Sequence, residues 1–170
     1  MLPGAVMEGT GPDAGVAAHY GSPAHEGRAW DAGTALVDLQ HLDVLAVTGP
    51  ERLTWLHRFT SQHLEGLTPG QSTESLILDP NGRIEHAFAV VDDGEATWLI
   101  TEHGRAAPLI AFLDSMRFAS RVEVEARPAA VVVAHRALAP PELTGALDAL
   151  VTWADPWPVT TGTRYAMPDG

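Results

Sequence analysis

The feature that most constrains the fold is a set of three apolar segments separated by two turn sequences, between Glu74 and Ile100. In the first turn, Asp79-Pro80-Asn81-Gly82, proline presets its own φ angle and the Asn-Gly pair tolerates positive φ. Asp92-Asp93-Gly94 repeats this arrangement one segment later. Connections this short join antiparallel neighbours. The sequence therefore predicts a three-stranded antiparallel meander.

Further strands and helices are expected on both sides of the meander. Val44 to Val47 is a β-branched and apolar run that stops at Gly49-Pro50, as strands do at turns. Apolar residues at helical spacing follow Pro50 and again follow Arg105. The expected elements are strands at 44–47, 121–126 and 131–134 and helices at 50–62, 105–118 and 140–150. Together they predict an α+β fold, a mainly antiparallel sheet with covering helices.

The charged residues exclude several classes of function. The net charge is −12 and all ten basic residues are scattered arginines, so the surface repels nucleic acid and anionic lipid. The absence of lysine and cysteine excludes lysine and thiolate chemistry within this segment. No apolar run approaches the roughly 20 residues of a membrane span. We predict a cytoplasmic protein that binds neither nucleic acid nor membrane.

Local patterns typical of a metal or catalytic site are missing from the sequence. The eight histidines include no pair at the i, i+2 or i, i+4 spacing that would let two side chains converge on a metal. No glycine-flanked serine elbow is present. Asp92 and Asp93 are adjacent carboxylates, but turn formation explains them. The sequence therefore assigns no metal ligand and no catalytic residue.

His86 is an ionisable residue in the middle of an apolar strand. Because alternate strand residues share a face, one face is expected to hold Ile84, His86, Phe88 and Val90, and the other Glu85, Ala87, Ala89 and Val91. The first face suits either a ligand wall or a core that contains one hydrogen-bonded histidine. The small residues of the second face suit close packing by a helix.

Several short motifs occur in an order that is typical of one family. They are LVDLQH at 36–41, VTGP at 47–50, WLH at 55–57, the TSQHLEGLTPG turn at 60–70 and LDPNG at 78–82. Over about His19 to Arg127 the chain resembles the N-terminal lobe of YgfZ-type folate-binding proteins, relatives of the glycine-cleavage aminomethyltransferase, or T-protein. The closing WADPWP also looks like actinobacterial members. The resemblance implies the first lobe of a cloverleaf of three lobes around a tetrahydrofolate.

On this basis the chain divides into three parts. Residues 1–28 are rich in Gly, Ala and Pro without a hydrophobic period, so we expect a flexible leader. Residues 29–127 would form the folate-binding lobe, and 128–170 the start of the next lobe, which we expect to be truncated. The Lys-Gly-Cys-Tyr-x-Gly-Gln-Glu signature of YgfZ-type proteins is absent. Trp153 and Trp157 lie in an ending without periodic pattern, and we expect them to be exposed as an orphaned interface.

The resemblance also implies where a folate would bind. Aminomethyltransferases carry Gly-Gly-Ile-x-Asp-Asp after the hairpin, where a carboxylate near the folate assists one-carbon transfer. This chain has His86-Ala87 in place of the Asp doublet, which puts His86 at the folate-facing position. The candidate folate-binding residues are His86, Phe88, Val90, Leu99 and Thr101, the last in place of an asparagine that touches folate in the relatives.

The expected function follows from the lost carboxylates, because an imidazole cannot replace a carboxylate in stabilising a developing cation. We expect a tetrahydrofolate-binding protein of the YgfZ type that supports iron–sulfur cluster assembly or repair, with folate as its ligand and iron–sulfur proteins as partners. No catalytic activity is expected of this chain alone. The alternatives are an aminomethyltransferase of glycine cleavage and one-carbon metabolism, and a non-catalytic interaction module.

Overall fold

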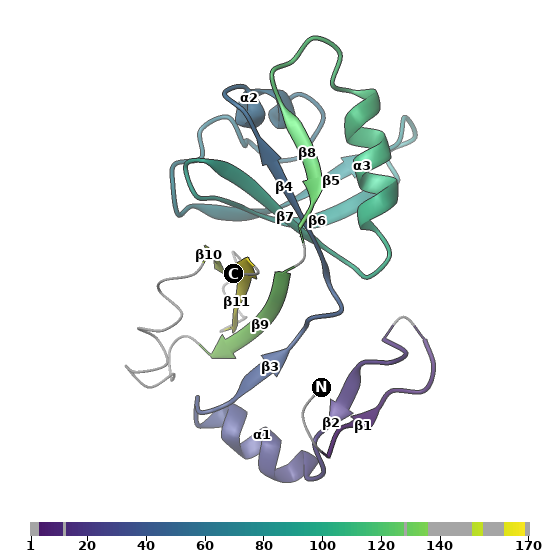
Figure 1. Cartoon of the computed structure of the whole chain (residues 1–170), viewed down its shortest axis with the longest axis vertical. Helices are drawn as coiled ribbons and strands as arrows, with labels where there is room; N and C mark the ends of the chain where they lie inside the picture. The colour runs from purple at the N-terminus through teal and green to yellow at the C-terminus, as the bar shows by residue number, and fades with distance from the viewer. Residues whose placement is uncertain (1–3, 12, 128, 136–150, 155–161, 169–170) are drawn as a thin grey trace.

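The computed structural model of the chain describes residues 4–11, 13–127, 129–135, 151–154 and 162–168. Its main sheet has five antiparallel strands in the order β5-β6-β7-β4-β8 (Figure 1). The strands are β4 (Asp43–Thr48), β5 (Ser72–Leu78), β6 (Ile84–Asp92), β7 (Ala96–Thr101) and β8 (Glu123–Ala126). The predicted meander is confirmed, because β5, β6 and β7 are neighbours in the sheet. The fold is α+β and mainly antiparallel, as predicted.

A second antiparallel sheet has four strands in the order β10-β11-β9-β3. Its strands are β3 (Leu36–Asp38), β9 (Ala129–His135), β10 (Val151–Ala154) and β11 (Gly162–Pro168). Although β3 directly precedes β4 in the chain, it pairs with β9, with Leu36 opposite Ala134. The chain therefore builds the second sheet from segments on both sides of the main sheet.

Helices cover one face of the main sheet. They are α2 (Arg52–His57) and α3 (Ala106–Ser115), and Figure 1 shows both beside the main sheet. The core on this face combines helix residues Trp55, Leu56, Leu109 and Leu113 with strand residues Leu45, Val47, Ile77, Phe88, Val90 and Leu99. α2 is shorter than the predicted helix at 50–62. The reason is that Ser61 bonds the outer edge of β5, its N–H donating to the Leu76 carbonyl at 2.8 Å and its Oγ accepting from the Leu76 N–H at 2.9 Å.

The second sheet covers the opposite face of the main sheet. The cluster there joins Val44, Ala46, Ala89, Val91, Ala96, Trp98 and Ile100 of the main sheet to Val131 of β9 and Trp153 of β10. We expected a helix against the small residues of this face, and a strand packs there instead. Small residues on this face, Ala46 and Ala89, belong to the same buried cluster as the large Trp153 ring.

The C-terminal segment differs most from the prediction. Trp153 was expected to be exposed, but it is 1% exposed and its indole N–H donates to the Thr73 carbonyl at 2.8 Å. Strands β10 and β11 form where the sequence showed no periodic pattern. The reason is that their pairing partners are β9 and each other, which no local pattern reveals. Trp157 and the expected helix at 140–150 lie outside the described residues.

The N-terminal segment also contains regular structure where none was expected. β1 (Val6–Met7) and β2 (Ala17–His19) form a two-stranded sheet, and α1 (Pro23–Asp31) follows. Glu26 holds the start of α1, because its carboxylate accepts from the Tyr20 N–H at 3.0 Å and the Ser22 N–H at 3.1 Å. The division of the chain at residues 28 and 127 stays a prediction.

Candidate functional site

A cavity of about 400 Å³ lies on the face of the main sheet that bears the small residues. Its walls come from three strands and from the segment that leads from β3 to β4. Strand residues Glu74, Leu76, Ala87, Ala89 and Ile100 line it, with Leu39, His41 and Leu42 from the connecting segment and Glu102 after β7. A cavity of this size is in the range of small-molecule sites. The alanines of β6 make the space, because a larger side chain at either position would fill it.

Polar residues of this cavity include two glutamates, one histidine and the hydroxyl residues Ser75 and Thr101. Glu74 and Glu102 contribute carboxylates, which accept hydrogen bonds from N–H donors of a ligand. The His41 side chain is 18% exposed, and its Nε2 lies 3.8 Å from Asp13 Oδ1. Its Nδ1 is buried and has no hydrogen-bond partner among the described residues. A buried polar atom without a partner is costly, so His41 Nδ1 is a ready contact for a polar ligand.

The five predicted folate residues do not gather around this cavity. Phe88 and Thr101 are among the residues that line it, and Thr101 Oγ1 donates to the Ala87 carbonyl at 2.9 Å. Val90 and Leu99 are each 0% exposed and belong to the core under the helices. Val90 and Leu99 therefore fit the alternative that this face is hydrophobic core, and their role in binding folate stays a prediction.

His86 lies on the helix side of β6, away from the cavity. It is 6% exposed, and its ring centroid is 5.6 Å from that of Phe112 in α3. Burial lowers the pKa of His86 below its ordinary 6.5, Glu85 opposes this shift and the Arg105 charge adds to it. His86 is therefore favoured in its neutral form, packed against an aromatic ring. Ala87, the second position of the replaced doublet, is the one that faces the cavity.

Sequence reasoning missed His41, Glu74 and Glu102 as cavity residues. Two signals were available: His41 ends the LVDLQH motif, and Ala87 and Ala89 mark the face of β6 with the smallest side chains. Neither signal says which face carries a cavity, because the opposing wall comes from the segment 39–42.

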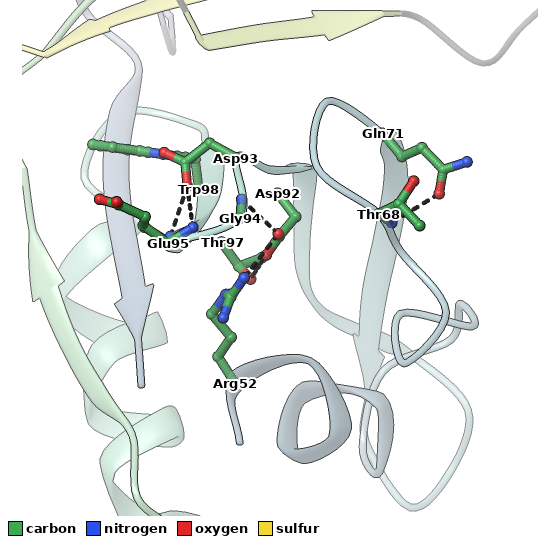
Figure 2. A network of polar contacts seen from close by, with 10 residues as sticks. Arg52, Thr68, Gln71, Asp92, Asp93, Gly94, Glu95, Thr97 and Trp98 are labelled. Atoms are coloured by element: carbon green, nitrogen blue, oxygen red, sulfur yellow. Dashed lines mark hydrogen bonds and ion pairs between the residues drawn. The ribbon is translucent and has the colours of Figure 1, made fainter. Parts of the chain in front are cut away.

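A second polar cluster lies at the turn between β6 and β7 (Figure 2). Arg52 of α2 donates to both oxygens of Asp92 at 2.9 Å, and Thr97 Oγ1 donates to Asp92 Oδ2 at 2.7 Å. Asp93 accepts from the Ala96 N–H and from the Trp98 indole, each at 2.7 Å. The predicted role of the Asp pair in turn formation is confirmed. Asp92 has the further role of binding α2 to the turn through Arg52.

Metal and membrane sites find no support in the described parts of the chain. In those ranges no three His, Asp or Glu side chains gather as a metal ion would require. None of the described helices combines the length and the apolar character needed to cross a bilayer.

The amino-acid sequence is similar to two known proteins, an aminomethyltransferase and a putative transferase. No protein-family model matches the chain. An aminomethyltransferase from Nitrosococcus oceani is 26% identical over 118 residues, which are 68% of this chain and 32% of that protein. A putative chloroplastic transferase from Arabidopsis thaliana is 30% identical over 101 residues, 57% of this chain and 23% of that protein. The chain thus spans a third or less of these relatives.

A solved structure has the same fold. The glycine cleavage system aminomethyltransferase T from Bartonella henselae aligns with a TM-score of 0.73 and 18% identity, covering 97% of this chain and 50% of that one. The sequence similarity and the shared architecture together show that this chain is homologous to part of the aminomethyltransferase superfamily and has the fold of half of such a protein.

Proposed function

We propose that this chain forms part of a tetrahydrofolate-binding protein of the YgfZ type, which supports the assembly or repair of iron–sulfur enzymes. The observation that supports binding is the cavity between β5, β6, β7 and the segment 39–42, in a chain homologous to aminomethyltransferases. A pterin ring is flat and carries several N–H donors. Alanine walls, two carboxylates and the buried His41 Nδ1 suit such a ring.

The replaced doublet favours binding over catalysis. The family carboxylates are here His86 and Ala87, and of these Ala87 lines the cavity without offering any acid–base group. A transferase needs a group that stabilises the developing cation of the one-carbon donor. In this proposal the chain holds the folate, and the lack of cysteine leaves cluster ligation to the partner proteins.

One observation favours the second candidate, an aminomethyltransferase of one-carbon metabolism. Glu74 and Glu102 line the cavity and offer carboxylates at positions other than the replaced doublet. Ammonia release from an aminomethylated donor in the presence of tetrahydrofolate decides between the two. Ammonia release by the wild-type chain that stops in both Glu74→Gln and Glu102→Gln would favour the transferase. A wild-type chain that binds folate tightly but releases no ammonia would support the binding role.

Calorimetric titration of tetrahydrofolate into this chain tests the binding. Ala87→Leu fills the cavity and should weaken binding at least about tenfold, a difference of about 1.4 kcal/mol. His86→Ala is the matched substitution on the neighbouring residue of the opposite face, and it should lower thermal stability while leaving affinity unchanged. If His86→Ala weakens binding and Ala87→Leu does not, the folate lies on the His86 face. If the unsubstituted chain gives no heat of binding, the proposal is overturned.

The iron–sulfur role has a separate test in cells. In a strain that lacks this chain, the activities of iron–sulfur enzymes should fall and should be restored by the wild-type chain. Ala87→Leu, expressed to the same level, should fail to restore them. Unchanged iron–sulfur activities in the deletion strain would refute this part of the proposal without affecting the folate titration.

A further inference from the structure

Phe118 is the most exposed large apolar side chain of the described residues. It is 88% exposed and lies in the segment that leads from α3 to β8. Its φ angle is +43°, and no other non-glycine residue in the described ranges has a positive φ. A bulky residue in this backbone region is strained. The backbone strain at Phe118 therefore places an aromatic ring in water, where it contributes little packing to the stability of the fold.

The backbone around Phe118 is tied to α2 and to the end of β4. The Trp55 indole N–H donates to the Met116 carbonyl at 3.0 Å, and the Ser120 N–H donates to the Arg117 carbonyl at 2.9 Å. A Cβ at Gly49 would overlap the carbonyl oxygen of Arg121, so the β4–α2 turn lies directly against this segment. Phe118 is therefore presented on a fixed support, which lowers the entropy cost of using it as an anchor.

Cavities lie on both sides of Phe118. One of about 490 Å³ is lined by the apolar Trp55, Phe59 and Met116 and by the charged Glu51 and Arg58. The other, of about 570 Å³, includes Arg117 and Arg121. Phe118, Ala119 and Ser120 line both. The segment thus forms a ridge with an apolar hollow on one side and a polar one on the other.

The charge of this corner differs from that of the whole chain. Three of the ten arginines line the two cavities together with two carboxylates, Glu51 and Glu123, on a chain of net charge −12. Arg121 is engaged by Glu51 at 2.7 Å, and this hydrogen bond is the main reason that the pKa of Glu51 is lowered. Arg117 reaches Asp114 only at 3.8 Å. The Arg58 side chain is exposed and forms no hydrogen bond or ion pair among the described residues, although its charge helps to lower the pKa of Glu51.

We propose that the corner formed by Arg58, Arg117, Phe118 and the Trp55–Phe59–Met116 cavity binds an acidic polypeptide segment of a partner protein. An apolar side chain of that segment enters the cavity beside Phe118, and its carboxylates pair with Arg58 and Arg117. Aromatic and arginine side chains at a fixed position are the residues that contribute most at protein interfaces. A second copy of this chain is the alternative occupant, and the oligomeric state of the chain tests it.

The probe is a fluorescein-labelled peptide of alternating glutamate and leucine, followed by fluorescence anisotropy. It should bind, and Phe118→Asn or Arg58→Ala should each weaken binding about tenfold. Asparagine tolerates positive φ, so the first variant keeps the loop. The matched controls are Ile84→Asn and Arg83→Ala, since Ile84 is 63% exposed and both residues lie at the far hairpin. These controls should leave the affinity unchanged.

Two further peptides separate the contributions. Lysine in place of glutamate should abolish binding, serine in place of leucine should weaken it, and high sodium chloride should weaken the parent peptide. The proposal is overturned if the parent peptide fails to bind. It is also overturned if the Ile84→Asn and Arg83→Ala controls lose as much affinity as the test variants. Dimerisation of the chain that Phe118→Asn abolishes would overturn it in favour of a second copy. Tetrahydrofolate titration of Phe118→Asn should match the wild type, because the folate cavity lies on the other face of the sheet.

Discussion

Asp92 is 1% exposed, so folding removes its carboxylate from water. The ion pair with Arg52 compensates the cost of burying this charge. Arg52→Met removes both charged hydrogen bonds and leaves the buried carboxylate with Thr97 and the Gly94 N–H alone. We expect a loss of about 3 kcal/mol in the free energy of unfolding, measured with urea. Arg127→Met is the matched control, because its pair with Glu125 is about half exposed and should contribute less than about 1 kcal/mol. Similar losses in the two variants would contradict the assignment.

His86 gives the chain a pH dependence of known sign. Burial lowers its pKa in the folded state below the ordinary 6.5, so the unfolded chain takes up the proton first. The contribution of neutral His86 to stability is complete above pH 6.5 and is lost as pH falls through the folded-state pKa. His86→Phe should flatten the stability profile in this window, as seen in urea midpoints. His25→Phe, at an exposed position of α1, should leave the profile as steep as in the wild type.

Phe118 stores strain that a substitution should release. Left-handed backbone costs an ordinary residue about 1–2 kcal/mol, and asparagine adopts it more readily. Because the Phe118 ring is 88% exposed, its removal costs little packing. Phe118→Asn should therefore raise the free energy of unfolding by up to about 1 kcal/mol, measured by chemical denaturation. A loss of stability would show that the ring packs in the folded state.

At the scale of the element, local signals were sufficient wherever the sequence contained its own turn. The hairpins at Asp79 and Asp92 were predicted because the turn residues lie next to each other in the chain. The helix at 105–118 was found as α3 because its apolar stripe is long. The helix at 50–62 was predicted too long, since its end is set by Ser61 pairing with Leu76 of β5.

Trp153 is the fully buried side chain of β10, which also pairs with β11 and bonds Ser72 through Ala154. Trp153 belongs to the buried cluster that contains Ala46 and Ala89, and it donates to the Thr73 carbonyl. Trp153→Ala should cost about 3–5 kcal/mol of unfolding free energy. Trp153→Phe keeps most of the apolar area and loses the hydrogen bond, and it should cost about 1–2 kcal/mol. Equal costs of the two substitutions in urea denaturation would show that the packing of the Trp153 ring contributes nothing to stability.

For the whole molecule, the two sheets share one core, so they should unfold together. Val131 of β9 and Ile100 of β7 belong to the same buried cluster. Hydrogen exchange should give amides of β7 and β9 the same free energy of opening, and Val131→Ala should lower both by the same amount. Loss of protection confined to β9 would show that the second sheet opens by itself.

Sequence by itself determined the antiparallel meander, the helix α3, the acidic surface and the grouping of β6 residues into two faces, because turn chemistry and apolar spacing act between near neighbours. It could not determine what covers each face. Only tertiary structure decided that the helices lie over His86, Val90 and Leu99 and that the cavity lies over Ala87 and Ala89. The physical reason is that the layers over β6 come from α2, α3, β9, β10 and the segment 39–42, none of which adjoins β6 in the chain. A strand's alternation separates its two faces but does not identify the partner of either.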